Sequence, residues 1–486
     1  MFIDNFDFVS PPKVRDALFG GRTEAFAAFY ELKNFNESEI CYFDICSLYP
    51  HVLMSKKFPI GYPEIITENF KDIDFYFGLV QCRVLPPTSL YLPVLPYRND
   101  KDKKLYFGLC SLCIQNKKFD KICTHSDFQR SWVGFFTTPE LKLAKRQGYK
   151  IVKIFEIWQF DSTINDNESS LCTGVFGDYF KTFIKLKMES TSLEGNGINK
   201  ASFNEKIGFQ NEVKDKLGID IDVQNIRENA PLRNIAKLFL NSSWGRLSMR
   251  SLNRKRMKMF SKCEDILNFW NTTKCDITDI IPLDKSVIIF YKEDEKYVKP
   301  ASNLNIVISV FTTSYARIEL YKLLEKCNRS ILYCDTDSII TVVNTFHPIN
   351  FELSSCIGGL KNELPVNNSI LKFYALGPKN YAFEYVDKFS GESKVKIVNK
   401  GFSPRDIENS SVSIDIIKDM AYQLCEIEGE NPSVEISSKK FKLYTTESKI
   451  YSIEQIRRYQ SCFEKRNPIK NSTLKFGLSY PWGYKT

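Results

Sequence analysis

The chain has 486 residues, of which 43% are hydrophobic and 26% are charged, a balance that is typical of folded globular proteins. A chain of this length can form several cores, so we expect two to four subdomains. Lysine and arginine number 67 against 58 acidic residues, which gives a net charge of +9. That excess suits a polyanionic partner wherever the basic side chains cluster.

Two further features limit the class of protein. The sequence contains no run of about 18 apolar residues, so no membrane span is predicted. The acidic, aromatic N-terminus resembles neither a signal nor a transit peptide. The 14 cysteines are mostly scattered within apolar runs. This scatter predicts reduced, buried thiols in an intracellular protein and argues against a disulfide scaffold.

In chain order, the sequence first predicts a strand over 38–45 that leads through a turn into a short helix over 47–55. Proline-rich residues 79–97 are predicted to form a strand and a connector. Further helices are predicted over about 138–147, 174–188, 232–247 and 302–327. Extended segments are predicted over about 150–160, over 330–343 as a β-hairpin, and over about 370–398. Residues 189–230 are polar and contain glycine. No motif is recognisable beyond residue 409.

The first motif lies at residues 42–50, Tyr-Phe-Asp-Ile-Cys-Ser-Leu-Tyr-Pro, where Asp44 ends the first strand. A carboxylate at the tip of an apolar strand can hold a divalent cation. The alternative is a helix cap, in which Asp44 or Ser47 satisfies the amides of the following turn.

The second motif lies on the helix predicted over 232–247. Arg233, Lys237 and Asn241 are spaced four residues apart, so they share one face. Two cations and an amide in a row suit a triphosphate. The alternative is a solvated basic face, although the Asn-Ser-Ser-Trp-Gly ending is poor in helix formers for a surface helix. The apolar stripe that packs this helix is predicted to consist of Leu232, Ile235, Ala236, Phe239 and Leu240.

The third motif is Tyr-Cys-Asp-Thr-Asp-Ser, which places Asp335 and Asp337 at the turn of the predicted hairpin. Like charges this close are unfavourable unless a cation compensates them. Mg²⁺, held by a few carboxylates and by substrate phosphates, does so. An acidic hairpin turn without a ligand is the alternative.

Four residues with zinc-ligand side chains lie close together in the chain: Cys110, Cys113, Cys123 and His125. The Cys-x2-Cys half is typical of a zinc knuckle, whereas Cys-x-His is a less usual second half. We expect either a structural zinc ion or buried free thiols.

The three motifs resemble, in the same order, motifs A, B and C of family B DNA polymerases. Residues 377–381, Gly-Pro-Lys-Asn-Tyr, resemble the Lys-x-Tyr motif that follows in this family. Residues 19–26 resemble the segment before motif A in the protein-primed branch, which occurs in viruses, organellar plasmids and virus-like transposons. The resemblance covers about residues 15–405. It implies an α/β (α+β) right-hand fold with an antiparallel-sheet palm, helical fingers and a small thumb.

The resemblance also implies a function, namely template-directed addition of dNTPs to a 3′-OH with two Mg²⁺ ions, or Mn²⁺ in their place. Protein-primed replication of a viral or mobile linear DNA is the implied setting. The implied metal ligands are Asp44 and Asp337, with Asp335 beside them in a supporting role. The implied nucleotide-binding residues are Tyr49, which would exclude a ribose 2′-OH, and Arg233, Lys237 and Asn241. DNA contacts are implied for Lys379 and Tyr381 and, by position, for Lys400.

The same resemblance implies a division of the chain. Residues 1–79 would begin the palm, 80–160 would form an insertion that contacts a terminal protein, and 161–246 would form the fingers. Residues 247–301 would be a second insertion, 302–405 the second part of the palm, and 406–486 the thumb. A basic run at the start of the second insertion suits phosphate contacts or simple solvation. This run consists of Arg246, Arg250, Arg254, Lys255, Arg256 and Lys258.

Only 43 residues precede Asp44, at the place where the family usually carries a 3′–5′ exonuclease domain. We therefore expect either a polymerase without proofreading or a fragment of a longer product. The alternative function is a catalytically silent remnant that binds only DNA or a partner.

Overall fold

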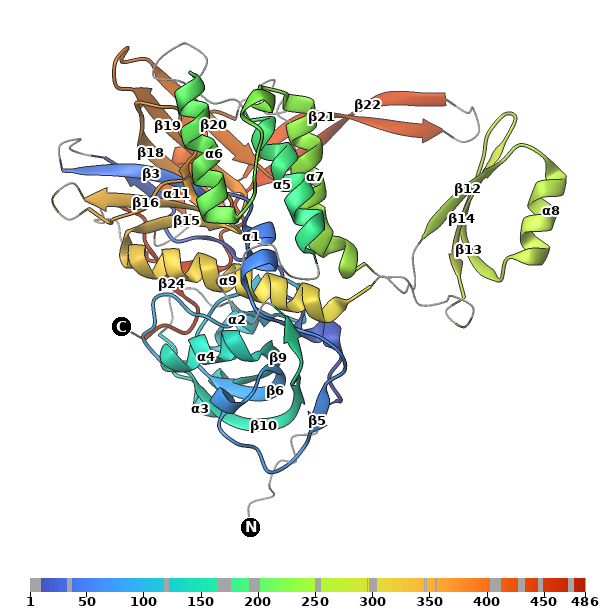
Figure 1. The fold of residues 1–486 in the computed structure, drawn as a ribbon, viewed down its shortest axis with the longest axis horizontal. Coiled ribbons are helices and arrows are strands. Elements are labelled where there is room, and N and C mark those ends of the chain that lie inside the picture. Colours follow the sequence, from blue (N-terminus) through green and yellow to red (C-terminus); the bar gives the residue numbers. More distant parts are fainter. Residues whose placement is uncertain are drawn as a thin grey trace.

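The computed structural model describes residues 10–32, 37–117, 122–164, 176–191, 202–249, 255–294, 296, 304–344, 346, 348–354, 356–402, 412–426, 433–444, 449–470 and 476–485. Its largest parts are a nine-stranded sheet and a four-stranded sheet, with the long helix α9 (Ile306–Cys327) lying between them (Figure 1). None of the described helices is long and apolar enough to cross a bilayer.

The nine-stranded sheet is antiparallel at every strand pairing. Alternate residues of β16 enter different cores, since Ile339 packs in the core that contains α9 and Ile340 in the core that contains α11 (Ile414–Gln423). Burial on both faces explains why this part of the sequence is a nearly continuous apolar run. The strands of the sheet are β1 (Thr23–Ala25), β15 (Ile331–Asp335), β16 (Ser338–Asn344), β3 (Ser38–Ile45), β18 (Asn368–Gly377), β19 (Asn380–Asp387) and β20 (Ser393–Asn399), with β17 (Leu360–Asn362) beside β3 and β2 (Phe29–Glu31) beside β18.

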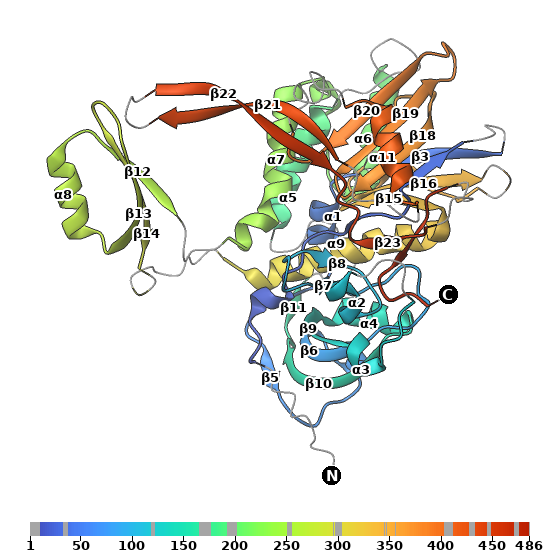
Figure 2. The same ribbon diagram turned by 180° about the vertical axis from the view of Figure 1, so that it is seen from behind.

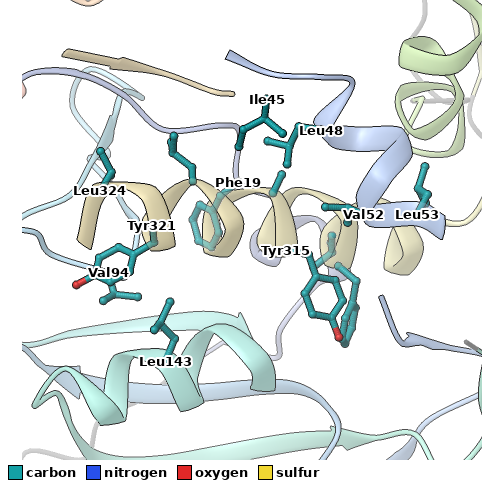
Figure 3. Close-up of a cluster of buried hydrophobic side chains, with 14 of the residues drawn as sticks. Phe19, Ile45, Leu48, Val52, Leu53, Val94, Leu143, Tyr315, Tyr321 and Leu324 are labelled. Atoms are coloured by element: carbon teal, nitrogen blue, oxygen red, sulfur yellow. The ribbon is translucent and has the colours of Figure 1, made fainter. Parts of the chain in front are cut away.

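Helix α9 is buried around most of its circumference, as expected for a helix in the middle of a large core. Leu48 and Val52 of α1 (Leu48–Ser55) pack on one side of it and Leu143 of α4 (Thr138–Arg146) lies on the other (Figure 3). Arg317 of α9 forms a buried ion pair with Glu140 of α4 at 2.7 Å. These contacts fix α1, and hence the end of β3, against the smaller sheet.

The four-stranded sheet has the order β5 (Glu64–Ile66), β10 (Lys150–Gln159), β6 (Gly78–Leu85) and β9 (Trp132–Thr137), and its pairings are antiparallel. A side chain at Gly78 would meet the carbonyl oxygen of Trp158 at 1.8 Å, so this close strand contact requires glycine. Short elements around this sheet are η1 (Val14–Ala17), β4 (Phe58–Pro59), η2 (Ile73–Phe75), β7 (Tyr97–Arg98), β8 (Leu105–Tyr106), α2 (Ser111–Asn116), α3 (Asp127–Arg130) and β11 (Thr163–Ile164).

A helical group lies beside the nine-stranded sheet and contains α5 (Gly177–Glu189), α6 (Phe203–Leu217), η3 (Val223–Asn225) and α7 (Ala230–Leu247). The rings of Phe183 in α5 and Phe239 in α7 stack at 4.7 Å. The polar, glycine-bearing segment 189–230 contains α6, a helix that the sequence analysis did not predict. That helix has a capping box between Ser202 and Glu205, and Gly218 ends it in the left-handed conformation.

A small module projects from the helical group, and Figure 2 shows it standing apart from the rest of the molecule. It contains β12 (Arg256–Phe260), α8 (Cys263–Thr272), β13 (Cys275–Pro282) and β14 (Val287–Glu293), with the strand order β12-β14-β13. Its own core is formed by Phe260, Phe269, Ile289 and Tyr291.

The C-terminal region contains α11 and a long antiparallel hairpin, β21 (Ser433–Tyr444) and β22 (Lys449–Gln460), followed by β23 (Arg466–Pro468) and β24 (Ser479–Pro481). The hairpin extends away from the nine-stranded sheet in both views (Figures 1 and 2). The remaining short element is η4 (Asn328–Ser330), which joins α9 to β15.

The expected α+β class with an antiparallel sheet is confirmed. The strand over 38–45 and the hairpin over 330–343 are confirmed, as are the helices over 47–55, 138–147 and 232–247, to within a few residues. The helices predicted over 174–188 and 302–327 begin at Gly177 and Ile306, directly after the cap residues Phe176 and Asn305. Residues 174–175 and 302–303 lie outside the described residues.

Candidate active site

Two neighbouring strands bring the three acidic residues of the sequence motifs together. Ser338 at the start of β16 lies directly opposite Asp44 near the end of β3. The backbone N–H of Ile45 donates to the carbonyl oxygen of Asp337 at 2.7 Å. Asp44 and the Asp335–Asp337 turn therefore meet at one edge of the nine-stranded sheet.

The turn between β15 and β16 has an unusual backbone. Thr336 has a φ of +59°, a conformation that costs a β-branched residue on the order of 1–3 kcal/mol. Its N–H donates to the carbonyl oxygen of Arg22 at 2.7 Å. A side chain at Gly21 would meet the Thr336 side chain at 2.9 Å. Residues 20–22, Gly-Gly-Arg, which directly precede β1, therefore hold the turn in this conformation.

The electrostatics of Asp44 and Asp337 differ from those of a solvated acid. Burial, followed by the charge of Asp337, raises the pKa of Asp44 to about 7. Burial, followed by the charge of Asp335, raises the pKa of Asp337 to about 6. Two half-buried carboxylates in mutual repulsion form a donor set that a divalent cation would relieve.

Asp335 has a different environment, because its carboxylate already has partners. Thr23 donates to its Oδ1 at 2.9 Å, and Lys379 contacts its Oδ1 and Oδ2 at 3.0 and 2.8 Å. Lys379 lies in the turn between β18 and β19 with a φ of +56°. Its N–H donates to the hydroxyl of Tyr333 at 2.7 Å. Asp335 is thus suited to a supporting role beside the other two acids.

Tyr381 lies in β19 and is largely buried, with an exposed fraction of 4%. Its ring packs against Tyr333 at 4.6 Å and its hydroxyl lies 3.4 Å from that of Tyr42. These contacts hold Tyr381 within the sheet.

The basic face of α7 is directed toward the acidic cluster. Burial raises the pKa of Asp44 and of Asp337, and the positive charge of Lys237 partly offsets this rise. The charges of Arg233 and Lys237 also add to the lowering of the Lys187 pKa that burial causes. The helix packs through Ala236 and Leu240, which are fully buried. The predicted apolar stripe was wrong for Ile235 and Phe239, which are 51% and 45% exposed. Phe239 is exposed on one side although its ring stacks on Phe183 of α5.

Tyr49 and Trp244 join the end of α7 to α1. Their rings stack at 4.7 Å with an interplanar angle of 27°, and Ser309 of α9 donates to the carbonyl oxygen of Trp244 at 2.8 Å. Burial and the charge of Asp337 raise the pKa of Tyr49 to about 12. The Tyr49 ring is therefore held in place beside the acidic cluster.

Sequence reasoning missed Lys187 of α5, which is 6% exposed. Its Nζ donates to the Ser47 hydroxyl at 2.7 Å, and burial lowers its pKa to about 8. Ser47 has a φ of +53° and makes no cap hydrogen bond through its side chain. The helix-cap reading of the first motif is therefore wrong for Ser47. Only the basic, amphipathic character of residues 174–188 gave a sign of this lysine.

A basic cleft of about 550 Å³ opens beside the Asp335–Lys379 pair. It brings the predicted Lys379 and Lys400 together with residues of the C-terminal region that carried no recognisable motif. The basic residues of its lining are Lys104, Lys379, Lys400, Arg457, Arg458 and Lys465, and Glu464 is its acidic residue.

The predicted zinc ligands also come together, and none of them is among the residues that line this cleft. The ligand atoms of Cys110, Cys113, Cys123 and His125 all lie within 4.8 Å of one another. Of the basic run after α7, Arg250 and Arg254 lie outside the described residues. Arg256 pairs with Glu293 at 2.7 Å, and Lys258 lies over the rings of Phe260 and Phe269.

Comparisons with known proteins agree with this arrangement. The family model of type B DNA polymerases, organellar and viral, matches residues 12–204. A DNA polymerase of Kluyveromyces lactis is 25% identical over 79% of this chain and 32% of its own length. A probable DNA polymerase of Neurospora intermedia is 22% identical over 90% of this chain and 36% of its own length. The chain thus spans about a third of the length of these relatives.

Solved structures show the same fold. The phi29 DNA polymerase complexed with primer-template DNA has a TM-score of 0.54 at 14% identity, and covers 92% of this chain and 62% of its own. Its complex with DNA and incoming nucleotides also gives 0.54, at 15% identity, over 91% and 61% of the two chains. The chain is therefore similar to the organellar and viral type B DNA polymerases in its motif order, in its sequence over residues 12–204 and in its fold.

Proposed function

We propose that the chain is the polymerase portion of a DNA-directed DNA polymerase that extends a primer 3′-OH with deoxynucleotides. The observation that carries this proposal is the position of Asp44 on β3 next to Asp337 in the β15–β16 turn, with the charge of Lys237 on α7 acting on both. Acids for metals and cations for phosphates are the two requirements of phosphoryl transfer.

Asp44 and Asp337 would hold two Mg²⁺ ions, for which Mn²⁺ could substitute. Their raised pKa values fit this role, because each carboxylate is destabilised by burial and by an acidic neighbour. When bound, the ions would neutralise the triphosphate and lower the pKa of the primer hydroxyl. Asp335 would keep the turn in position through Thr23 and Lys379.

Arg233, Lys237 and Asn241 would bind the triphosphate from α7. Lys187 would add a further positive charge for the triphosphate from α5. It lies close enough to Arg233 and Lys237 for their charges to contribute to its lowered pKa. Tyr49 would exclude a ribose 2′-OH, because its ring is fixed between Trp244 and the acidic cluster. Binding and orientation are the main contributions that side chains make to this reaction.

The basic cleft would hold the primer-template duplex. Lys400, Arg457 and Arg458 line this cleft, together with Lys379, which also pairs with Asp335. Their positive charge suits phosphate contacts of no sequence preference. Tyr381 would support this wall from within the sheet.

The division of the chain into palm, fingers, thumb and two insertions follows from the same proposal. Residues 80–160 would contact a terminal protein, and the module within 247–301 would close over DNA. Protein priming and the replication of a viral or mobile linear DNA are inferred from the branch that the chain resembles.

The test is primer extension on a simple template with Mg²⁺ and dNTPs, beside the Asp337→Asn variant. We expect extension by the wild-type chain and its loss in the variant, with primer-template binding kept in both. A folded wild-type chain that binds DNA but extends nothing would refute the proposal and favour a DNA-binding remnant.

A further inference from the structure

We propose that Cys110, Cys113, Cys123 and His125 bind one structural zinc ion, and that this ion fixes a loop on which the C-terminal segment rests. The four residues lie in and around α2 and before α3, outside the acidic cluster and α7. The polymerase function proposed above neither requires nor predicts such an ion.

The donor distances fit a tetrahedral ion. His125 Nδ1 lies 3.3 Å from the sulfur of Cys110, 3.3 Å from that of Cys113 and 3.6 Å from that of Cys123. Zinc bonds of about 2.3 Å to sulfur and about 2.0–2.1 Å to nitrogen give tetrahedral separations of about 3.6 Å between sulfur and nitrogen. The three sulfurs and the ring nitrogen therefore surround a space that one ion would fill.

Hydrogen bonding between free thiols does not explain this geometry. A ring nitrogen of neutral histidine offers either one hydrogen or one lone pair, whereas three sulfurs converge on Nδ1 of His125. Cys110, Cys113 and Cys123 are free cysteines in the structure. Convergence of several soft donors on one point is the pattern of a coordination sphere.

The local structure is too small to hold this arrangement by packing alone. Helices α2 and α3 have six and four residues, short of the length at which helices are stable in isolation. The Ser111 hydroxyl lies 3.1 and 3.0 Å from the carbonyl oxygens of Gln129 and Ser131, so the two helices are already joined at one point. Zinc would provide the second junction, between Cys110 and Cys113 on one side and Cys123 and His125 on the other.

The same loop supports the C-terminal segment. The N–H of Leu109 donates to the carbonyl oxygen of Trp482 at 2.7 Å. A side chain at Gly483 would meet the Cβ of Cys110 at 2.4 Å, so the two backbones are in close contact. Lys117, which ends α2, pairs with Glu464 at 2.6 Å, and Glu464 lines the basic cleft. The zinc-bound loop would therefore brace one wall of that cleft.

The first test is the metal content of the full chain, purified from zinc-supplemented cultures, measured by mass spectrometry of the elements. We expect one zinc per chain in the wild type and none in Cys113→Ser. The matched control is Cys263→Ser, because Cys263 is an exposed thiol of the projecting module and its loss should leave the zinc in place. A folded wild-type chain without stoichiometric zinc would overturn the proposal, as would full zinc retention in Cys113→Ser.

A second measurement does not depend on whether Cys113→Ser folds. Wild-type chain whose zinc has been exchanged for Co²⁺ should show the intense absorption of tetrahedral cobalt with thiolate ligands. A spectrum of octahedral cobalt without thiolate charge transfer would overturn the assignment of the ligands.

The brace itself is tested by hydrogen exchange. After zinc is removed with a chelator, we expect amide exchange over 479–485 to accelerate by about tenfold or more, since local opening follows the loss of local contacts. The hairpin β13–β14 of the projecting module serves as the internal control and should not change. Unaltered exchange over 479–485 would refute the brace. These measurements are independent of catalysis, so failure of the proposed polymerase function would not affect them.

Discussion

At the scale of single residues, the acidic cluster is surrounded by side chains whose chemistry depends on burial. Tyr49 is held by stacking on Trp244, and Lys187 is a nearly buried lysine that donates to Ser47. Burial of the Lys187 ammonium does not stabilise the fold, because a buried ammonium is costly without a carboxylate partner. Such residues are commonly kept for function, and two predictions follow from them.

Replacing Tyr49 with alanine should admit ribonucleotides. The variant removes the ring that would contact the sugar, so we expect discrimination between dNTP and rNTP to fall by about tenfold or more, where each tenfold step is about 1.4 kcal/mol. Competitive single-nucleotide incorporation measures this ratio. Tyr49→Phe, which keeps the ring, is the control. Unchanged discrimination in Tyr49→Ala would show that another residue contacts the sugar.

Replacing Lys187 with methionine should weaken nucleotide binding without destabilising the fold. Loss of one charged contact to phosphate is expected to raise the KM for dNTP by about tenfold. Burial lowers the pKa of Lys187 from 10.5 to about 8, so the folded chain releases this proton at a lower pH than the unfolded chain. Wild-type stability should therefore gain a contribution as pH rises from about 8 to 10.5, and the variant should lack it.

The control for Lys187 is Lys185→Met, which removes a half-exposed lysine of the same helix that pairs with Glu189 at 3.7 Å. Steady-state kinetics and thermal melting at several pH values measure the two effects. An unchanged KM in Lys187→Met would remove this residue from the nucleotide site.

At the scale of elements, the strained turn between β15 and β16 depends on a segment more than 300 residues earlier. Thr336 keeps its left-handed backbone while its N–H donates to Arg22, and Gly21 leaves room for its side chain. Strain at such a position persists only where the surrounding structure enforces it.

Replacing Gly21 with alanine should therefore impair catalysis more than stability. The new methyl group would press on Thr336 at 2.9 Å and displace Asp335 and Asp337. Because misplacement by about 1 Å can cost on the order of 100-fold in rate, we expect a comparable loss in single-turnover extension. Gly20→Ala is the matched control, since a side chain there meets nothing within 4 Å. Equal activity in the two variants would contradict this role.

At the scale of the whole molecule, the two ends of the described chain meet in a buried charge cluster. Glu24 of β1 pairs with Arg22 at 2.8 Å and lies 3.8 Å from Arg466 of β23, and all three are fully buried. Arg466 also contacts the carbonyl oxygens of Ser479 and Tyr91. The cluster thereby ties the C-terminal region to the sheet that carries the acids.

Replacing Glu24 with glutamine should destabilise the whole molecule. Two guanidinium groups would remain buried without their carboxylate, a change that typically costs about 3–5 kcal/mol. Thermal melting should show a clearly lower midpoint, and limited proteolysis should release the C-terminal region first. Glu64→Gln, at an exposed position, is the control. A melting curve like that of the wild type would show that the cluster is not required for stability.

Sequence patterns of short range were sufficient for the elements that carry the chemistry. The strand over 38–45 and the hairpin of Asp335 and Asp337 were predicted from short apolar runs bounded by polar residues, and the shared face of Arg233 and Lys237 from their four-residue spacing. The four candidate zinc ligands were likewise visible in their spacing. These strand runs were recognisable because their side chains are buried in the sheet and are therefore apolar.

Two elements were missed because their burial is weak. Helix α6 buries only Phe209, Val213 and Leu217, and the β21–β22 hairpin extends from the sheet with few buried side chains among those described. Without a continuous buried face, neither helix nor strand leaves a strong pattern. The capping box at Ser202 was the available signal for α6.

Other features depend on contacts between distant parts of the chain. The basic cleft combines Lys379 and Lys400 with Arg457 and Arg458, and the register of β16 on β3 sets Asp337 beside Asp44. The burial that shifts the pKa of Lys187 also arises only when α5 packs beside α1 and α7. No local sequence pattern predicts these features, because each depends on contacts between segments that are far apart in the chain and meet only in the folded protein.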